Sequence, residues 1–527
     1  MAFLRFVKNA TVVGGIGYTS YVLHQSEFDV QSIGLFRFGR AAWTVGCIAA
    51  DYRFSVVNLT DDSDSTMKAW SECHLRSANR LLNLCSANGG VFVKVGQHIA
   101  ALDHLVPREY VDTLKILHNR APLTSLKDIR KVIKNELDAE LEELFDDFEP
   151  TPLGTASLAQ VHRARLKDDG PVVAVKVQHP NVRKHSVVDI ATMELLVNCV
   201  SKLFANFDFR WLAEETRRNL PLELDFYNEG INGERMADIL KKFPWVKIPK
   251  IYWKYTTERT LVMEFAEGEL ISNRDYFLKQ KIDTVELSNR IEKMYNEMIF
   301  INGTVHCDPH PGNILVKVHE YGGEFDIILL DHGLHTKLTE EFRETYSGMW
   351  IGVLEGNEPQ IIECAKKLGI SISKHHAQLL SCMISSKPWS AVKRGLANVP
   401  DAITRGKEDE ELRKNASKYF GDINKILATV DRQLLLIMKT NDLIRSIAKS
   451  LGNDERKSFL TMTRSCFKVD KMRRLRESPG IFSSILIHLG ASWFFFKLRI
   501  YSFYLWLTYT RPNIQLGDIY LAELESA

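Results

Sequence analysis

The sequence has few of the features that would assign it to several common classes of protein. Its eight cysteines are scattered and form no CxxC pair, so we expect neither a disulfide framework nor a structural zinc site, and the compartment should be reducing. Lys and Arg number 68 against 66 Asp and Glu, which leaves a net charge of only +2. Without a basic stripe interleaved with aromatic residues, no nucleic-acid partner is expected. Internal repeats and low-complexity tracts are also missing.

The 527 residues, 45% of them hydrophobic, are enough for several domains or one large two-lobed domain. Apolar residues recur at helical spacing from 67 to about 148, and helical sequence resumes up to about 243. Between these stretches, "SLAQVHRARL" and "PVVAVKVQ" predict a β-hairpin, and after them "VKIPKIYWKYTTERTLVMEFAEG" predicts further strand. The rest is mainly helical to about 476. We therefore predict an α+β fold of two lobes, with the strands mostly before residue 266.

The N-terminal stretch "MAFLRFVKNATVVGGIGYTSYVLHQSE" contains Arg5 and Lys8 but no acid before Glu27. A basic start without acids is typical of a mitochondrial targeting segment. The apolar part, 10–23, is shorter than the roughly 20 residues that span a bilayer. Its length also suits a secretory signal, in which case the protein would be secreted. The following residues, 26–59, predict an amphipathic helix at a membrane or on the body of the protein.

The C-terminal stretch "IFSSILIHLGASWFFFKLRIYSFYLWLTY" is strongly apolar and aromatic but includes Lys497 and Arg499. It is marginal as a spanning helix, and it suits an interfacial helix, a buried hairpin or a helix packed on the domain. We divide the chain into a targeting or membrane-proximal segment, a helical extension, a strand-rich lobe, a helical lobe and an apolar tail, at 1–60, 61–150, 151–266, 267–470 and 471–527.

Two short stretches carry hard oxygen ligands, "HCDPHPGNILV" and "ILLDHGL". Phosphoryl transfer from a nucleotide needs mainly positioning and neutralisation of charge. Asp308 can orient or deprotonate an acceptor hydroxyl, and Asn313 and Asp331 can hold Mg²⁺. We interpret His306 as a structural histidine rather than a base, whereas the neighbouring histidines, His310 and His332, remain ambiguous.

The chain also supplies a lysine that could hold nucleotide phosphates. Lys176 lies in "VVAVKVQ", whose alternation predicts a strand, and Glu223 in "LPLELDFYNEG" is a helical carboxylate that could orient it. A hydrophobic strand, "LVMEF", follows and contains Glu264. Each signal alone is weak, but together and in this order they predict a protein-kinase-like fold.

These motifs closely resemble the aarF-domain family of atypical kinases (UbiB-like proteins) from about 67 to 445, in a mitochondrial branch rather than the branch that serves coenzyme Q. "KVGQ", "ASLAQVH", "ELDFYNE", "HCDPHPGN", "DHG" and "LLLIMKTNDLIR" carry the resemblance. It implies binding of ATP or ADP with Mg²⁺. The nucleotide-binding residues that it implies are Leu153, Gly154, Thr155, Ala156, Ser157, Val161, Lys176 and Glu264.

The resemblance further implies two ion pairs, Lys176 with Glu223 and Lys94 with Glu229. The second pair would plant the K-x-G-Q helix across the site as a regulatory lid, with Lys94 and Gln97 facing it. The residues alone are equally consistent with an ordinary helix that bears an exposed lysine.

Several positions depart from the expected patterns. The phosphate loop "PLGTASLAQVH" has one glycine, Gly154, where protein kinases have three and this family usually has alanine at Gly154 and Thr155. Cys307 replaces the usual arginine, and His310 stands where protein kinases place a lysine. No A-P-E motif follows Asp331, so the platform for a peptide substrate is missing.

Three functions follow from these observations. The first is an atypical kinase or ATPase that acts on, or is coupled to, a small-molecule or lipid acceptor at a mitochondrial membrane. "HCDPHPGN" also resembles the loop of aminoglycoside- and choline-type phosphotransferases, which favours a small acceptor. The second is a nucleotide-gated scaffold that works through mitochondrial inner-membrane protein partners. The third, on weaker grounds, is a Ser/Thr protein kinase.

Overall fold

The computed structural model describes residues 34–56, 64–100, 106–118, 123–204, 209–319, 323–370, 373–395, 408, 411, 419–453, 455–478 and 480–510. The predicted targeting segment at 1–33 lies outside these residues. The chain forms two compact units. The first comprises Met1–Ile282, His306–Thr336 and Gly406–Leu443, and the second comprises Asp283–Val305, Lys337–Arg405 and Ile444–Ala527.

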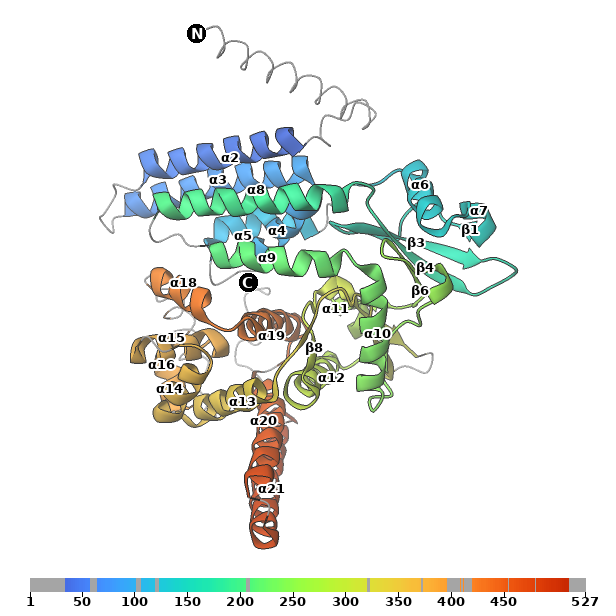
Figure 1. Ribbon diagram of the computed structural model, residues 1–527. Coiled ribbons are helices and arrows are strands. Elements are labelled where there is room, and N and C mark those ends of the chain that lie inside the picture. The colour runs from blue at the N-terminus through green and yellow to red at the C-terminus, as the bar shows by residue number, and fades with distance from the viewer. Residues whose placement is uncertain are drawn as a thin grey trace, which may run out of the picture. The chain divides into compact units, whose positions relative to one another are not determined.

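The first unit begins with a layer of helices. Three of them, α2, α3 and α8, lie side by side (Figure 1). Helix α3 ends where Gly89 and Gly90 adopt positive φ angles of 65° and 50°. The elements of this layer are α2 (Gly34–Ser55), α3 (Asp64–Asn88), α4 (Gly90–Ala100), α5 (Arg108–Leu114), η2 (Lys115–His118), α8 (Val182–Leu203) and α9 (Arg210–Glu223).

Helix α2 confirms the helix predicted within 26–59 and packs on the body of the protein. The buried Arg37 donates from Nε to the Asp189 carboxylate of α8 at 2.8 Å, and its Nη1 donates to the Asn88 carbonyl oxygen. Arg40 donates to the Ala87 carbonyl oxygen at 2.9 Å. These bonds satisfy carbonyls at the C-terminal end of α3. The inward face of α2 is therefore fixed by arginines, while Trp43 remains 76% exposed.

A five-stranded antiparallel sheet follows, in the order β1-β3-β4-β6 with β2 beside β3. The predicted hairpin is confirmed as β3 paired with β4. Side chains alternate across β4, so Val173, Val175 and Val177 pack in one core with α6, while Ala174 and Lys176 face the side covered by α10. The elements are α6 (Leu126–Leu137), α7 (Leu141–Leu144), β1 (Phe145–Phe148), β2 (Gly154–Thr155), β3 (Ala159–Leu166), β4 (Val172–Gln178), α10 (Phe226–Leu240), η3 (Trp253–Tyr255) and β6 (Thr260–Glu264).

A second sheet positions the polar loops, in the order β5-β10-β9-β7. Leu329 of β10 pairs with Ile314 of β9, and the Leu330 N–H donates to the Asn313 carbonyl oxygen at 3.0 Å. Asn313 and Asp331 therefore leave this hairpin at the same end. Strands β8 and β11 pair in a separate two-stranded sheet. The sheets and the elements around them are β5 (Val246–Lys247), β7 (Glu269–Leu270), α11 (Arg274–Lys279), β8 (Thr304–His306), η5 (Pro311–Asn313), β9 (Ile314–Val318), β10 (Phe325–Leu329), β11 (His335–Lys337), α18 (Phe420–Thr429) and α19 (Arg432–Ser450).

The second unit is helical around α13, where Tyr346 and Trp350 are fully buried. The apolar tail forms one continuous helix, α21, so the hairpin alternative is wrong. Among the described residues, no helix is both long enough and apolar enough to cross a bilayer. The elements are α12 (Thr284–Asn296), η4 (Glu297–Asn302), α13 (Glu340–Glu355), α14 (Glu358–Lys367), α15 (Lys374–Ser385), α16 (Trp389–Arg394), α20 (Glu455–Glu477) and α21 (Ile481–Thr510).

The structure confirms the predicted α+β class and its helical extensions, whereas the predicted domain boundaries stay predictions. The eight cysteines are all free thiols, as the sequence indicates.

The buried ion pair of α2 yields a first prediction. Arg37→Ala should lower the free energy of unfolding by about 3–5 kcal/mol, because it leaves the Asp189 carboxylate buried without its cation. Thermal melting of the whole protein measures this loss. Arg183→Ala is the matched control, since both side chains of its pair with Glu258 are more than half exposed. Equal melting temperatures for the two variants would contradict the prediction.

Candidate active site

Lys176 lies at the centre of a network of charges in the first unit. Its Nζ donates to both carboxylate oxygens of Glu229, at 2.7 and 2.9 Å, and to Oδ2 of Asp331 at 3.2 Å. It also lies over the Phe226 ring, 4.9 Å from the centroid. Burial alone would lower the pKa of Lys176, but Asp331 and Glu229 outweigh it and raise the pKa. Lys176 is therefore a fixed cation that faces the loop that bears Asp331.

The predicted pairing of Lys176 with Glu223 and of Lys94 with Glu229 is wrong, because the partners are exchanged. Helix α9 ends at Glu223, and Asp225 then caps the new helix α10 by accepting the Asn228 N–H. Glu229 lies in the first turn of α10, whose Phe226 packs on the sheet that contains Lys176. The break between the two helices sends the two glutamates in different directions.

Glu223 instead pairs with Lys94 of α4, with Nζ and Oε2 2.7 Å apart. This happens because Val91 of α4 packs with Leu220 and Leu224 around the end of α9. The same ammonium lies 3.9 Å from Oδ2 of Asp308. Burial alone would lower the pKa of Lys94, but Glu223 and Asp308 raise it. Lys94 does face the site, and the alternative of an exposed surface lysine is wrong.

The remaining residues of the K-x-G-Q motif anchor the helix. A Cβ added to Gly96 would lie 2.4 Å from Cδ1 of Leu117, so only glycine permits this close packing. Gln97 donates to the Leu117 carbonyl oxygen at 3.0 Å. Within the described part of the chain no hydrogen bond joins Gln97 to the site carboxylates. Its predicted role as a lid residue therefore stays a prediction.

Asp308 lies between two lysines. Besides Lys94, Lys439 of α19 reaches it, with Nζ 3.2 Å from Oδ1. Burial alone would raise the pKa of Asp308, but Lys439 and Lys94 outweigh it and hold the pKa well below its usual range. The sequence motifs did not assign a role to Lys439, although it lies within "LLLIMKTNDLIR". Only the family likeness of that stretch could have pointed to it.

Asn313 and Asp331, the predicted metal ligands, lie at the end of the β9–β10 hairpin. Asn313 donates from its side-chain amide to the Asp308 carbonyl oxygen at 3.2 Å. Oδ1 of Asp331 accepts the Gly333 N–H at 2.9 Å. Although partial burial raises the pKa of Asp331, Lys176 and this N–H lower it well below its usual range. The structure thus gathers an anionic carboxylate and an amide beside Asp308.

The predicted phosphate loop is a tight turn between β2 and β3, closed by a 2.8 Å bond from the Ala156 N–H to the Ala159 carbonyl oxygen. Ser157 is buried, whereas Gly154 is exposed with space for a Cβ. Val161 of β3 pairs directly with Lys176. The loop is therefore joined to the lysine strand by the ladder, as the kinase-like prediction requires.

The other predicted loop and strand residues differ in their surroundings. Leu153 is 52% exposed and Thr155 is half-buried. Glu264 ends β6, and its carboxylate accepts the Lys250 N–H at 3.2 Å. None of these contacts tests nucleotide binding, so these three assignments stay predictions.

The loop 306–313 is called the catalytic loop after its predicted role, and two of its histidines have structural partners. His306 bonds through Nε2 to the Asp331 carbonyl oxygen. His310 accepts the Gly312 N–H on Nδ1 at 3.1 Å and so closes the short turn η5. The interpretation of His306 as a structural residue agrees with this bond, which ties the start of the catalytic loop to the loop that carries Asp331.

A strand lysine held by a helical glutamate, next to loops that supply Asp308, Asn313 and Asp331, defines a kinase-like nucleotide-binding protein. Comparison with known proteins agrees. Residues 116–365 match the ABC1 atypical kinase-like domain.

Curated relatives extend this likeness over most of the chain. It is 44% identical over 482 residues to AarF domain-containing protein kinase 1 of Mus musculus, covering 91% of this chain and 90% of that one. It is 43% identical over 510 residues to AarF domain-containing kinase 1 of Drosophila melanogaster, covering 96% and 97%. A Dictyostelium discoideum relative named probable serine/threonine-protein kinase abkB is 34% identical over 420 residues, covering 79% of this chain and 60% of that one. The chain belongs to the ABC1/AarF atypical kinase family, which confirms the predicted resemblance.

The exchanged ion pairs predict different effects for the two glutamates. Glu229→Gln should weaken nucleotide binding about tenfold, since a charge-assisted bond to Lys176 contributes about 1.5–3 kcal/mol. Glu223→Gln should change the affinity less than about twofold, because Lys176 keeps both carboxylates. Titration with a fluorescent nucleotide measures both. A larger loss in Glu223→Gln than in Glu229→Gln would restore the pairing expected from the sequence.

Lys439 yields a prediction about pH. Lys439→Met removes the cation nearest to Asp308, so the pKa of Asp308 should rise toward its usual value. If turnover needs the ionised carboxylate, it should fall off at a higher pH in this variant than in the wild type, where the pKa of Asp308 is too low to limit it. Lys449→Met, a change of the same kind at an exposed position of α19, is the control. An acid limb that moves equally in both variants would contradict the assignment.

Proposed function

We propose that the protein is an atypical kinase or ATPase that binds Mg-ATP and acts on, or is coupled to, a small-molecule or lipid acceptor. The observation that carries this proposal is the single network in which Lys176 meets Glu229 and Asp331. Phosphoryl transfer depends on such fixed charges more than on covalent chemistry by the protein. The Lys176 ammonium would hold phosphate oxygens.

The residues at the site fit Mg²⁺. Asp331 offers a carboxylate that is 37% exposed, and Asn313 offers an amide oxygen on a neighbouring loop. Hard oxygen ligands of this kind, together with phosphate oxygens and water, are what Mg²⁺ takes in nucleotide sites. When bound, Mg²⁺ would neutralise charge on the phosphates. Asp331 would serve this role in its ionised form, which Lys176 favours.

Asp308 would orient the acceptor hydroxyl rather than remove its proton. A general base works best when its pKa lies near the operating pH, whereas Lys439 and Lys94 hold the pKa of Asp308 far below it. The lysines would also attract an anionic acceptor, such as one that carries a phosphate. The acceptor would be small, since Lys94 of α4 lies 3.9 Å from the Asp308 carboxylate.

ADP is the alternative to ATP as the bound nucleotide. The turn at Gly154 differs from both the protein-kinase loop and the usual alanine pair of the family, and Ser157 does not project into solvent. The backbone of this turn, rather than its side chains, would therefore contact the phosphates.

We further propose that the protein works on the surface of a mitochondrial membrane. The N-terminal sequence is basic and lacks acids. Helix α21 supports contact with lipid, since its apolar side chains are largely exposed, among them Phe482, Leu486, Leu489, Trp493 and Phe496. Apolar side chains of this density bind at the interface of a bilayer.

A nucleotide-gated scaffold without catalytic output, acting through inner-membrane protein partners, is the second candidate. The favouring observation is that Asp308 is already paired with two lysines. A Ser/Thr protein kinase is the weaker candidate, because no A-P-E platform follows Asp331. One relative nevertheless bears the name of a probable serine/threonine-protein kinase.

Nucleotide turnover separates these candidates. Mg²⁺-dependent ATP hydrolysis by the wild type should exceed that of Asp308→Asn and Asp331→Asn by at least about 100-fold, since each loses a charge at the reacting phosphate. The assay is run with and without anionic liposomes, and with ADP for comparison. Lys449→Met should retain the wild-type rate. Tight binding with equal, negligible turnover in all variants would favour the scaffold instead.

A further inference from the structure

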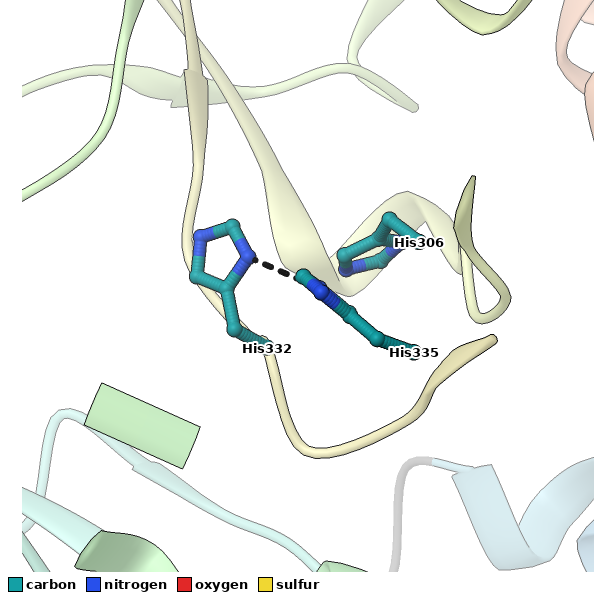
Figure 2. A group of neighbouring side chains, drawn as sticks. All are labelled: His306, His332 and His335. Atoms are coloured by element: carbon teal, nitrogen blue, oxygen red, sulfur yellow. Dashed lines mark hydrogen bonds between the residues drawn. The ribbon is translucent and has the colours of Figure 1, made fainter. Parts of the chain in front are cut away.

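Three histidines gather next to Asp331, on the side of the loop that the nucleotide chemistry does not use. His306 ends β8, His332 follows Asp331, and His335 opens β11. Their potential ligand atoms all lie within 4.8 Å of one another. Figure 2 shows the three rings beside one another, and their centroids are 5.3–5.5 Å apart. His306 and His332 are only 1% and 4% exposed, so this is a built cluster rather than a surface coincidence.

The closest pair has the spacing of two ligands on one cation. Nδ1 of His332 and Nε2 of His335 are 3.2 Å apart, as the dashed line in Figure 2 marks. Two imidazole nitrogens that are each about 2.0–2.1 Å from a tetrahedral Zn²⁺ lie about 3.3 Å apart. A hydrogen bond between the two rings would have the same length, so this spacing alone does not distinguish a shared cation from a hydrogen bond.

The tautomer of His306 is fixed by its partner. Its Nε2 lies against the Asp331 carbonyl oxygen, which can only accept, so Nε2 carries the proton. A neutral ring in this tautomer has its lone pair on Nδ1. Metal-bound histidines characteristically donate their other N–H to a backbone carbonyl or carboxylate in this way, which orients the ring.

A histidine-only network leaves polar atoms unsatisfied. Nε2 of His332 and Nδ1 of His335 are buried and have no hydrogen-bond partner within the described structure. An ion bound through Nδ1 of His332 and Nε2 of His335 would leave these two atoms as N–H groups, so they favour neither arrangement.

Metal-bound histidines are neutral imidazoles, and burial favours the neutral form of these three rings. Burial lowers the pKa of His332 to about 3 and that of His335 to about 2, and it also lowers the pKa of His306. The Asp331 carboxylate on the adjoining residue adds favourable charge.

We propose that His306, His332 and His335 form a site for one transition-metal ion of the zinc class, separate from the magnesium ligands Asn313 and Asp331. Imidazole nitrogen suits Zn²⁺ and its neighbours in the first transition row, whereas Mg²⁺ and Ca²⁺ prefer oxygen. Three protein ligands leave a fourth position for water. Such an ion would tie the start of the catalytic loop to both sides of the Asp331 turn and so set the position of that carboxylate.

Cobalt(II) tests the site in the full-length protein. Metal-free protein titrated with Co²⁺ in excess Mg²⁺ should develop the intense visible absorption of a tetrahedral ion at one equivalent, and Zn²⁺ should abolish it. X-ray absorption at the zinc edge should show three imidazole ligands without sulfur. Failure of the cobalt band to develop, or an X-ray absorption spectrum of oxygen ligands alone, would overturn the proposal without affecting the proposed nucleotide chemistry.

Variants place the ion. His335→Gln should weaken Zn²⁺ binding by more than about 100-fold, since changes outside the ligand shell alone cost about 10–100-fold. His335→Cys should keep the ion and add a thiolate charge-transfer band. His319→Gln, a change at a more exposed histidine, and Asp331→Asn should retain the cobalt spectrum. Unchanged binding in His335→Gln, or a cobalt band lost in Asp331→Asn but not in His335→Gln, would contradict the site.

Discussion

The pairing of two largely buried lysines with carboxylates from other elements is the constraint on which the rest of the site depends. An uncompensated ammonium inside a protein is expensive, so Lys176 and Lys94 must each find an anion before the elements can pack. Lys176 finds Glu229 and Asp331, and Lys94 finds Glu223. Segments far apart in the sequence are thereby brought to one place, and the loop that bears Asp331 is held against the sheet.

The same network gives Asp308 an unusual environment. In the described structure it is flanked by Lys94 of α4 and Lys439 of α19, which are far apart in the sequence. Two adjacent cations make its carboxylate a stable anion and a weak base. A site of this kind would favour positioning over proton abstraction, and it would tolerate an acceptor that brings its own negative charge. Gly96 contributes to this arrangement, since a side chain there would require Leu117 or α4 to shift.

Local sequence signals predicted the fold well, whereas the partners of the charged residues could not be predicted. The alternation in "VVAVKVQ" sufficed for β4, which pairs with β3 as the predicted hairpin requires. Glu223 and Glu229 lie only six residues apart, so which one reaches Lys176 depends on the helix break at Asp225. Lys439 and the histidine cluster depend on contacts between distant segments, for which periodicity carries no information.

The turn at Asp331 separates two kinds of ligand chemistry within three residues. Successive side chains in an extended chain point to opposite sides, so Asp331 faces Lys176 while His332 faces His306 and His335. One side offers anionic oxygen that is balanced by lysine, and the other offers neutral nitrogen without charge. A hard cation bound with phosphates and a softer cation bound by imidazole would therefore not compete for the same atoms. Because His306 also bonds the Asp331 carbonyl oxygen, a change on the nitrogen side would be felt at the carboxylate through the backbone rather than through shared ligands.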